Sequence, residues 1–302
     1  MTVHSAANGR PAPWTAADMP SLSGRTVVVT GASSGVGLAT AAAFARARAH
    51  VVLAVRDVER GEQARRIVGG SSEVRRLDLA DLGSVREFAG SWDGPLDVLV
   101  NNAGVAGPGE RTRDGFERQF GTNHLGPFAL TNLLLPHVVD RVVTVASGSH
   151  KSATMHFDDL NQHHHRLGFV AGYGQSKLAN LLFTLDLERR LREADSGIRA
   201  TAAHPGYSAT NIGIRGRNEL LAGAVRLAGR LFAQTPEQGA LPSLFAATQD
   251  VPGASYLGPD GRTGLHGHPA LVGRSAEASD PAAARRLWAV SEELTGVGFG
   301  LG

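Results

Sequence analysis

Short runs of β-branched residues alternate with longer amphipathic stretches along the first two thirds of the chain. This alternation is typical of repeated strand–helix–strand units, in which parallel strands form one sheet covered by helices on both faces. Six runs are predicted as strands, at residues 26–30, 50–55, 73–79, 96–102, 141–147 and 198–204. We therefore expect an α/β fold with a doubly wound parallel sheet of the Rossmann type, in a single domain.

Helix formers with apolar residues three and four positions apart fill the intervals between these runs. The predicted helices span residues 37–49, 61–69, 115–136 and 173–192. Farther on, the triplet Thr235-Pro236-Glu237 combines an N-cap residue, a first-turn proline and an acid, which predicts a helix start. Residues 258–264 have the composition of a turn, and a last helix is expected near 281–295.

Both ends of the chain and one internal segment depart from this pattern. Residues 1–20 are interpreted as a flexible N-terminal arm, since they lack the basic and apolar regions of a secretory signal. Residues 21–296 are predicted to form the domain, followed by a tail at 297–302. Within the domain, the glycine- and arginine-rich segment 207–234 is a candidate substrate lid.

Composition narrows the function classes. Of the 302 residues, 42% are hydrophobic and 19% charged, as in ordinary globular proteins. The absence of cysteine excludes disulfides, a thiolate nucleophile and cysteine-ligated metals, and it fits a cytoplasmic location. No apolar run reaches the length of a membrane helix, and a net charge of +2 gives no reason to expect nucleic acid. We expect neither a membrane nor a nucleic-acid partner.

A glycine-rich turn follows the first strand run, in the stretch TVVVTGASSGVGLAT, with Gly31, Gly35 and Gly37. Glycine permits a tight turn and lets a pyrophosphate approach the amides at a helix N-terminus, where the helix dipole favours an anion. The spacing is G-x-x-x-G-x-G, and such a loop is also compatible with a plain strand-to-helix turn. Its place after the first strand favours nucleotide binding.

The end of the second strand run bears on the choice of cofactor, because an acid there would bind the ribose hydroxyls of NAD. In this chain Val55 occupies that position and Arg56 follows it. A charge-assisted contact between arginine and phosphate favours the 2′-phosphate of NADP by about 10- to 100-fold. We therefore predict NADP(H). The alternative is that Arg56 is a solvated charge and Asp57 is the acid that binds the ribose.

Several motifs in this order resemble the short-chain dehydrogenase/reductase superfamily. They are TGASSGVG, the NNAG of residues 101–104, Ser147 at the end of the fifth strand run, the YGQSK of 173–177 and the HPG of 204–206. The resemblance runs from about Ser21 to about Gly296. Finer features such as FERQFGTNHLGPF, SKLANLLF and RRLWAVSEELTG resemble the branch of retinol dehydrogenases, protochlorophyllide reductases and WW-domain-containing oxidoreductases. The resemblance implies that residues 21–296 are an NADP-binding domain of this family.

Tyr173 and Lys177 would carry the chemistry of such an enzyme. Four positions apart on a helix, they share one face, so the ammonium can stabilise the phenolate and hold the nicotinamide ribose. Lowering the tyrosine pKa from about 10 to near 7 requires about 4 kcal/mol, more than one lysine supplies, so the oxidised nicotinamide would have to contribute. Tyr173 would act as general acid in reduction and general base in oxidation.

The resemblance completes the catalytic set with Ser147 and Asn123. Ser147 would hydrogen-bond the substrate oxygen and stabilise its developing negative charge, with Ser149 as the neighbouring candidate. Asn123, in GTNHLG, corresponds to the asparagine that relays protons through water in the family. The alternative for Asn123 is a polar residue whose hydrogen bonds are satisfied within a helix.

The remaining cofactor contacts are implied by the resemblance, with the adenine near Asp78 and Leu79 and the nicotinamide near Pro205, Gly206 and Thr210. The full predicted cofactor-binding set is Gly31, Ser33, Ser34, Gly35, Val36, Gly37, Arg56, Asp78, Leu79, Asn102, Ala103, Gly104, Tyr173, Lys177, Pro205, Gly206 and Thr210. We expect no metal, because the consecutive His163, His164 and His165 cannot easily converge on one ion.

These features predict an NADP(H)-dependent oxidoreductase that transfers a hydride between nicotinamide and an alcohol or carbonyl group of a moderately apolar small molecule. Many members of the family are dimers or tetramers, so a homo-oligomer is compatible with the resemblance. Two alternatives stay open. One is an NADPH-dependent reductase of a conjugated C=C bond, and the other is a regulatory protein that binds the dinucleotide without consuming it, although such a protein has no need of the serine, tyrosine and lysine together.

Overall fold

The computed structural model describes residues 13–107, 109–164, 167–206 and 234–301. Within them, eight strands form one sheet in the order β3-β2-β1-β4-β5-β6-β7-β8. The strands are β1 (Thr26–Thr30), β2 (His50–Val55), β3 (Ser72–Arg76), β4 (Leu96–Asn101), β5 (Val138–Val145), β6 (Arg199–Ala203), β7 (Tyr256–Pro259) and β8 (Pro269–Leu271). Neighbours from β3 to β7 pair in parallel, and β8 runs antiparallel to β7. The predicted doubly wound α/β fold is confirmed.

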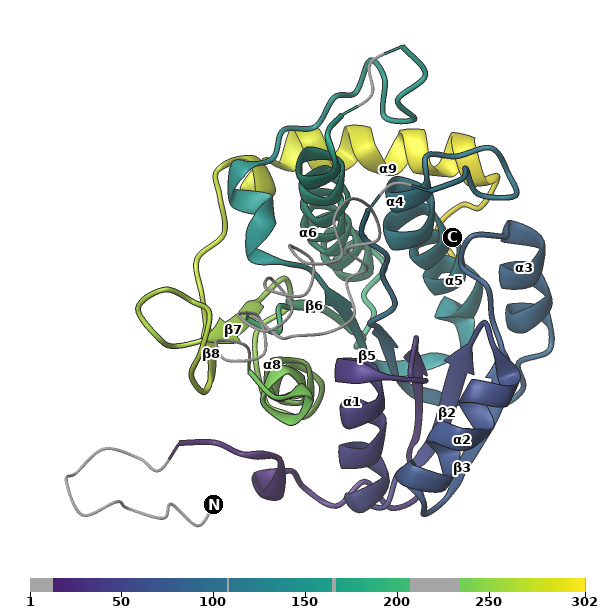
Figure 1. Cartoon of the computed structure of the whole chain (residues 1–302), viewed down its shortest axis with the longest axis vertical. Helices are drawn as coiled ribbons and strands as arrows, with labels where there is room; N and C mark the ends of the chain where they lie inside the picture. Colours follow the sequence, from purple (N-terminus) through teal and green to yellow (C-terminus); the bar gives the residue numbers. More distant parts are fainter. Residues whose placement is uncertain (1–12, 108, 165–166, 207–233, 302) are drawn as a thin grey trace, which may run out of the picture.

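Helices cover both faces of this sheet (Figure 1). They are α1 (Gly35–Arg46), α2 (Val58–Val68), α3 (Leu82–Gly90), α4 (Arg118–Phe120), α5 (Gly126–Leu134), α6 (Phe169–Glu193), α8 (Pro236–Thr248) and α9 (Pro281–Thr295). Helices α1, α2 and α8 lie on one face, α3, α5 and α6 on the other, and α9 packs on the outside of α6. None of the helices in these residues is both long enough and apolar enough to span a bilayer.

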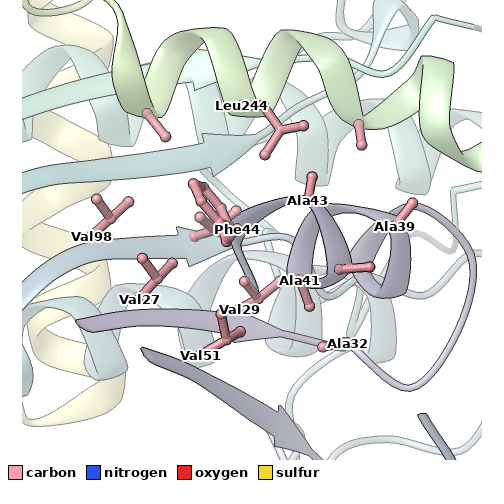
Figure 2. Packing of buried hydrophobic residues seen from close by; sticks show 14 of the residues in the cluster. Val27, Val29, Ala32, Ala39, Ala41, Ala43, Phe44, Val51, Val98 and Leu244 are labelled. Carbon is pink, nitrogen blue, oxygen red and sulfur yellow. The ribbon is translucent and has the colours of Figure 1, made fainter. Parts of the chain in front are cut away.

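The period of two along the central strands divides the core between the two faces. Val27 and Val29 point to the face of α1 and α8, where Phe44 and Leu244 pack against them (Figure 2). Val28, between them, points to the opposite face. The central strand β1 is therefore buried on both faces, as its continuous apolar run requires.

Two strands and several element ends differ from the sequence prediction. The short strands β7 and β8 were not expected, and Gly258 and Pro259 of the predicted turn belong to β7. Strand β3 ends at Arg76, because Asp78 then accepts a hydrogen bond from the amide of Ala80 and starts a turn. The helix predicted over 115–136 is divided into α4, a π-helical turn at Gly121–Leu125, and α5.

The described parts of both chain ends pack against the domain. The ring centre of Trp14 lies 5.1 Å from that of Phe245 in an edge-on contact. Near the other end, Val297 is buried and the ring of Phe299 lies 6.1 Å from that of Trp288. Within the segment that the sequence suggested as an arm, the side chains of Trp14, Ala16 and Met19 pack against the hydrophobic core.

His124 connects α9 to the π-helical turn. Its ring is buried, its Nε2 atom lies 2.9 Å from the Ser291 hydroxyl, and the aromatic rings of Phe120, Phe128 and Phe183 surround it. Burial lowers the pKa of His124 to about 3. Folding therefore keeps this imidazole neutral at pH values where it would be charged in the unfolded chain.

We expect His124→Phe to weaken the decrease in the free energy of unfolding that occurs as pH falls. The unfolded histidine takes up a proton below pH about 6.5, whereas the folded one does not, so the free energy of unfolding decreases as pH falls. The stability difference between the wild type and the variant should change by about 2 kcal/mol between pH 6.5 and 4.5. Urea unfolding at both pH values measures it, and a constant difference would contradict the assignment.

Candidate active site

The predicted site residues follow the carboxyl ends of neighbouring strands. The glycine loop follows β1, residues 102–104 follow β4, Ser147 follows β5, and residues 204–206 follow β6. The strand order reverses between β1 and β4, and open α/β sheets bind ligands in the crevice outside such a reversal. The fold thus brings these segments together at one edge of the sheet.

The loop after β1 and the segment after β4 are joined by hydrogen bonds. The Thr30 hydroxyl accepts the amides of Asn102 and Ala103, both at 3.0 Å, and the Asn102 side-chain amide donates to the Thr30 carbonyl at 2.8 Å. A Cβ atom at Gly37 would collide with the Asn102 side chain and the Gly31 carbonyl. Gly31 itself has a φ of +67°. Glycine is needed at both positions for this close approach.

The N-terminus of α1 differs from those of the two helices that follow it. Asp57 and Asp81 accept backbone amides of the first turns of α2 and α3, whereas the hydroxyl of Ser34, the N-cap residue of α1, accepts none. Uncapped amides at a helix N-terminus can bind an anion. Together with Gly31 and Gly37, this arrangement fits the pyrophosphate of a dinucleotide.

Arg56 and Asp57 lie where β2 ends. Both are exposed, and the Asp57 carboxylate accepts the amide of Arg60 at 3.1 Å as the N-cap of α2. Farther along this edge, the backbone amide of Asp78 donates to the Ser84 hydroxyl. The Leu79 carbonyl lies so close to Gly126 that a Cβ atom at position 126 would collide with it.

Ser147, Tyr173 and Lys177 meet beside the end of β5. The Tyr173 and Ser147 side chains are hydrogen-bonded. The Lys177 Nζ atom lies 5.8 Å from the centre of the Tyr173 ring and donates to the Val145 carbonyl at 2.9 Å. That carbonyl also accepts the side-chain amide of Asn180 at 3.1 Å. The geometry places two hydroxyls and one amine where a single substrate oxygen and a ribose could be bound.

Burial controls the protonation of this group. It raises the pKa of Tyr173, with the Ser147 hydrogen bond acting in the opposite direction, and it lowers the pKa of Lys177 to about 8. The protein groups alone therefore do not bring the tyrosine pKa toward neutrality, as expected from the strength of a single lysine. A cationic group of the cofactor would act in the required direction.

The Asn123 side chain holds a backbone segment. Its Oδ1 atom accepts the Val105 amide at 2.7 Å, and its Nδ2 atom donates to the Val105 carbonyl and the Ser176 hydroxyl, both at 2.9 Å. A Cβ atom added to Gly104 would lie 3.4 Å from both Asn123 Oδ1 and Lys177 Nζ. Asn123 thus lies at the site, but both Nδ2 hydrogens are engaged, as in the alternative of a satisfied polar residue.

Some predicted residues lie outside the described part of the chain: Thr210, His165 and all of the candidate lid except Gln234. Pro205 and Gly206 follow β6 and are half-buried. Thr30, His150 and Asn180 were missed by the sequence analysis. Only Asn180 had a signal, because it lies three positions after Lys177 on the same helix.

Comparison with known proteins decides the family. The model of the short chain dehydrogenase family matches residues 25–219. The chain belongs to this family. Short-chain dehydrogenases are nicotinamide-dependent oxidoreductases, so the coarse activity expected from the motifs is established.

Individual relatives agree with the branch that the motifs indicated. Human retinol dehydrogenase 13 is 39% identical over 297 residues, covering 91% of this chain and 85% of the relative. A cattle protein, dehydrogenase/reductase SDR family member 13, is 40% identical and covers 93% and 76%. The chain thus resembles retinol dehydrogenases over most of its length.

Solved structures of other proteins share the fold. A crystal structure of an uncharacterized protein from Mycobacterium paratuberculosis has a TM-score of 0.84 and 51% identity, covering 95% of this chain and 99% of the other. A structure from Beutenbergia cavernae, described as an NAD(P)-dependent gluconate 5-dehydrogenase with NADP at low occupancy, has a TM-score of 0.57 and 31% identity, covering 76% and 91%.

We expect the buried Lys177 to reduce the stability of the cofactor-free enzyme at neutral pH. Its pKa of about 8 in the folded state lies below the ordinary lysine value of 10.5, so the unfolded chain binds more protons between these values. The free energy of unfolding of the wild type, relative to Lys177→Met, should therefore increase by about 2 kcal/mol from pH 8 to 10. Urea unfolding tests this, and a decrease or no change would contradict the shift.

Proposed function

We propose that this short-chain dehydrogenase uses NADP(H) to interconvert an alcohol and a carbonyl group on a small, moderately apolar molecule. The observation that supports it is the meeting of Ser147, Tyr173 and Lys177 beside the glycine loop, at one edge of the sheet. A bound nicotinamide supplies or accepts the hydride. The protein groups supply the proton, the orientation and the electrostatic stabilisation.

Each catalytic side chain has a role that follows from its place. The Ser147 hydroxyl donates a hydrogen bond to the substrate oxygen and stabilises the negative charge that develops there in reduction. The Tyr173 hydroxyl, hydrogen-bonded to Ser147, reaches the same oxygen and gives it a proton, or removes one in oxidation. The Lys177 ammonium, 5.8 Å from the Tyr173 ring, favours the phenolate once the proton has left.

The preference for NADP rests on the end of β2. Asp57, the rival ribose ligand, already caps α2 through its carboxylate. Arg56 is exposed, and within the described residues it makes no hydrogen bond or ion pair. A free guanidinium at this edge suits a 2′-phosphate better than a ribose hydroxyl.

The decisive experiment is a screen of NADPH oxidation over aldehydes, ketones and enones of graded size, with mass and infrared analysis of the products. We expect the carbonyl absorption to disappear as an alcohol forms. Retention of the carbonyl with saturation of the neighbouring double bond would indicate C=C reduction. Binding of NADPH, followed by its fluorescence, without turnover of any substrate would favour the regulatory protein.

We expect Tyr173→Phe to lower kcat by at least about 100-fold, because it removes the proton donor and leaves the ring in place. The Kd for NADPH, measured by fluorescence titration, should stay nearly unchanged, since the phenol hydroxyl makes little contact with the cofactor. A variant that keeps most of its turnover would refute the role of Tyr173.

Arg56→Ala should raise the KM for NADPH by about 10- to 100-fold and leave that for NADH nearly unchanged, because only NADPH carries the 2′-phosphate. Arg66→Ala is a matched control, since it removes another exposed arginine, from the last turn of α2. Equal effects of Arg56→Ala on both cofactors would rule out the phosphate contact.

A further inference from the structure

His150 is a buried residue that the proposed mechanism does not use. It lies in the 3₁₀ turn Gly148–Ser152, directly after Ser147, and its side chain has no exposed surface. Its Nδ1 atom lies 2.6 Å from the Ser147 carbonyl oxygen. On the other side of the ring, the backbone amide of Ser275 donates to Nε2 at 3.3 Å. The ring thus bridges two segments that are 125 residues apart.

The two partners determine which nitrogen carries the proton. A backbone carbonyl can only accept a hydrogen bond, and a backbone amide can only donate one. Nδ1 must therefore be protonated and Nε2 bare, so the ring is the neutral Nδ1–H tautomer. Burial lowers the pKa of His150, which agrees with a neutral ring. A second proton on Nε2 would face the Ser275 N–H and break the bridge.

His150 holds the Ser147 carbonyl through two hydrogen bonds. The Ser147 carbonyl also accepts the backbone amide of His150 at 3.2 Å, so the backbone and the side chain of one residue close on the same oxygen. The Tyr256 ring crosses the His150 ring at 84°, with 5.4 Å between the two ring centres. The centre of the His204 ring lies 5.2 Å from the centre of the Tyr256 ring. These contacts restrict rotation of the imidazole.

We propose that His150 is a positioning residue, whose bridge between the Ser147 carbonyl and the Ser275 amide fixes the direction of the Ser147 hydroxyl toward the substrate oxygen. The inference rests on the proposed function, because it assigns Ser147 a contact with the reacting carbonyl. It adds His150 to the residues on which the reaction depends, beside the serine, the tyrosine and the lysine. A displacement of a reactive group by about 1 Å can cost about 100-fold in rate, so a brace on this peptide has kinetic consequences.

Three substitutions separate positioning from general stability. In His150→Asn, the side-chain amide can take the place of Nδ1 and donate to Ser147. In His150→Gln, the longer amide extends toward the place of Nε2, where its oxygen can accept the Ser275 amide but the donor to Ser147 is lost. His150→Leu removes both bonds. His163→Asn is a matched control, because His163 is an exposed histidine of a neighbouring loop.

With the carbonyl substrate found in the screen, we expect kcat to fall by about 10- to 100-fold in His150→Leu and His150→Gln, and by no more than about threefold in His150→Asn. The Kd for NADPH should stay unchanged in all of them, and His163→Asn should match the wild type. Thermal unfolding monitors folding of each variant. Equal losses in the asparagine and glutamine variants, or a leucine variant with wild-type kcat, would overturn the assignment.

A second measurement does not depend on turnover. Nitrogen-15 NMR of the histidine rings, with the His150 signals assigned by their loss in His150→Asn, should show a neutral ring protonated at Nδ1 at pH 7. An Nε2–H tautomer would overturn the bridge. Failure of the proposed function looks different: the wild-type enzyme would then bind NADPH and reduce no carbonyl, while the tautomer result would stand on its own.

Discussion

The close approach of the glycine loop to the segment after β4 is the constraint on which the site depends. Thr30 holds this approach through its hydroxyl, which accepts two amides of that segment, and through its carbonyl, which accepts the Asn102 side chain. Gly37 leaves the room that a side chain would fill. The parallel order of β1 and β4 makes this contact possible, since both strands end at the same edge. The proposed dinucleotide cleft is thereby joined to the segment after β4 through one set of hydrogen bonds.

Desolvation is the second constraint, and it affects binding and chemistry together. Lys177 is buried with a backbone carbonyl as its hydrogen-bond partner, and no acid is among the causes of its pKa shift. Such an amine releases its proton more easily than a surface lysine, and the same burial disfavours the Tyr173 phenolate. The protein alone therefore does not supply enough positive charge to stabilise the Tyr173 phenolate. A cofactor that carries positive charge in its oxidised form would complement it, which couples catalysis to cofactor binding.

The sequence predicts what depends on local pattern and misses what depends on contacts between distant residues. The bounds of β1 and β2 follow from β-branched runs, and the start of α8 follows from its N-cap threonine and first-turn proline. Strands β7 and β8 were not predicted, because they are short and contain proline or glycine, residues that are typical of turns. The motif residues were found by resemblance. The hydrogen bonds that Asn123 and Thr30 make in the site could not be predicted, because their partners lie 18 to 73 positions away along the chain.

The distribution of the site along the chain has a consequence for specificity. The family model covers residues 25–219, and the glycine loop, the NNAG segment and the YGQSK segment all lie within it. The His150 ring contacts Ser275 and Tyr256. Both residues belong to the later part of the chain, where the alternating pattern weakens. The last third therefore does more than close the sheet, because it braces the turn that carries Ser147. Changes in β7 or in the segment before α9 can then alter the proposed reaction through the turn that carries Ser147, without touching any motif residue.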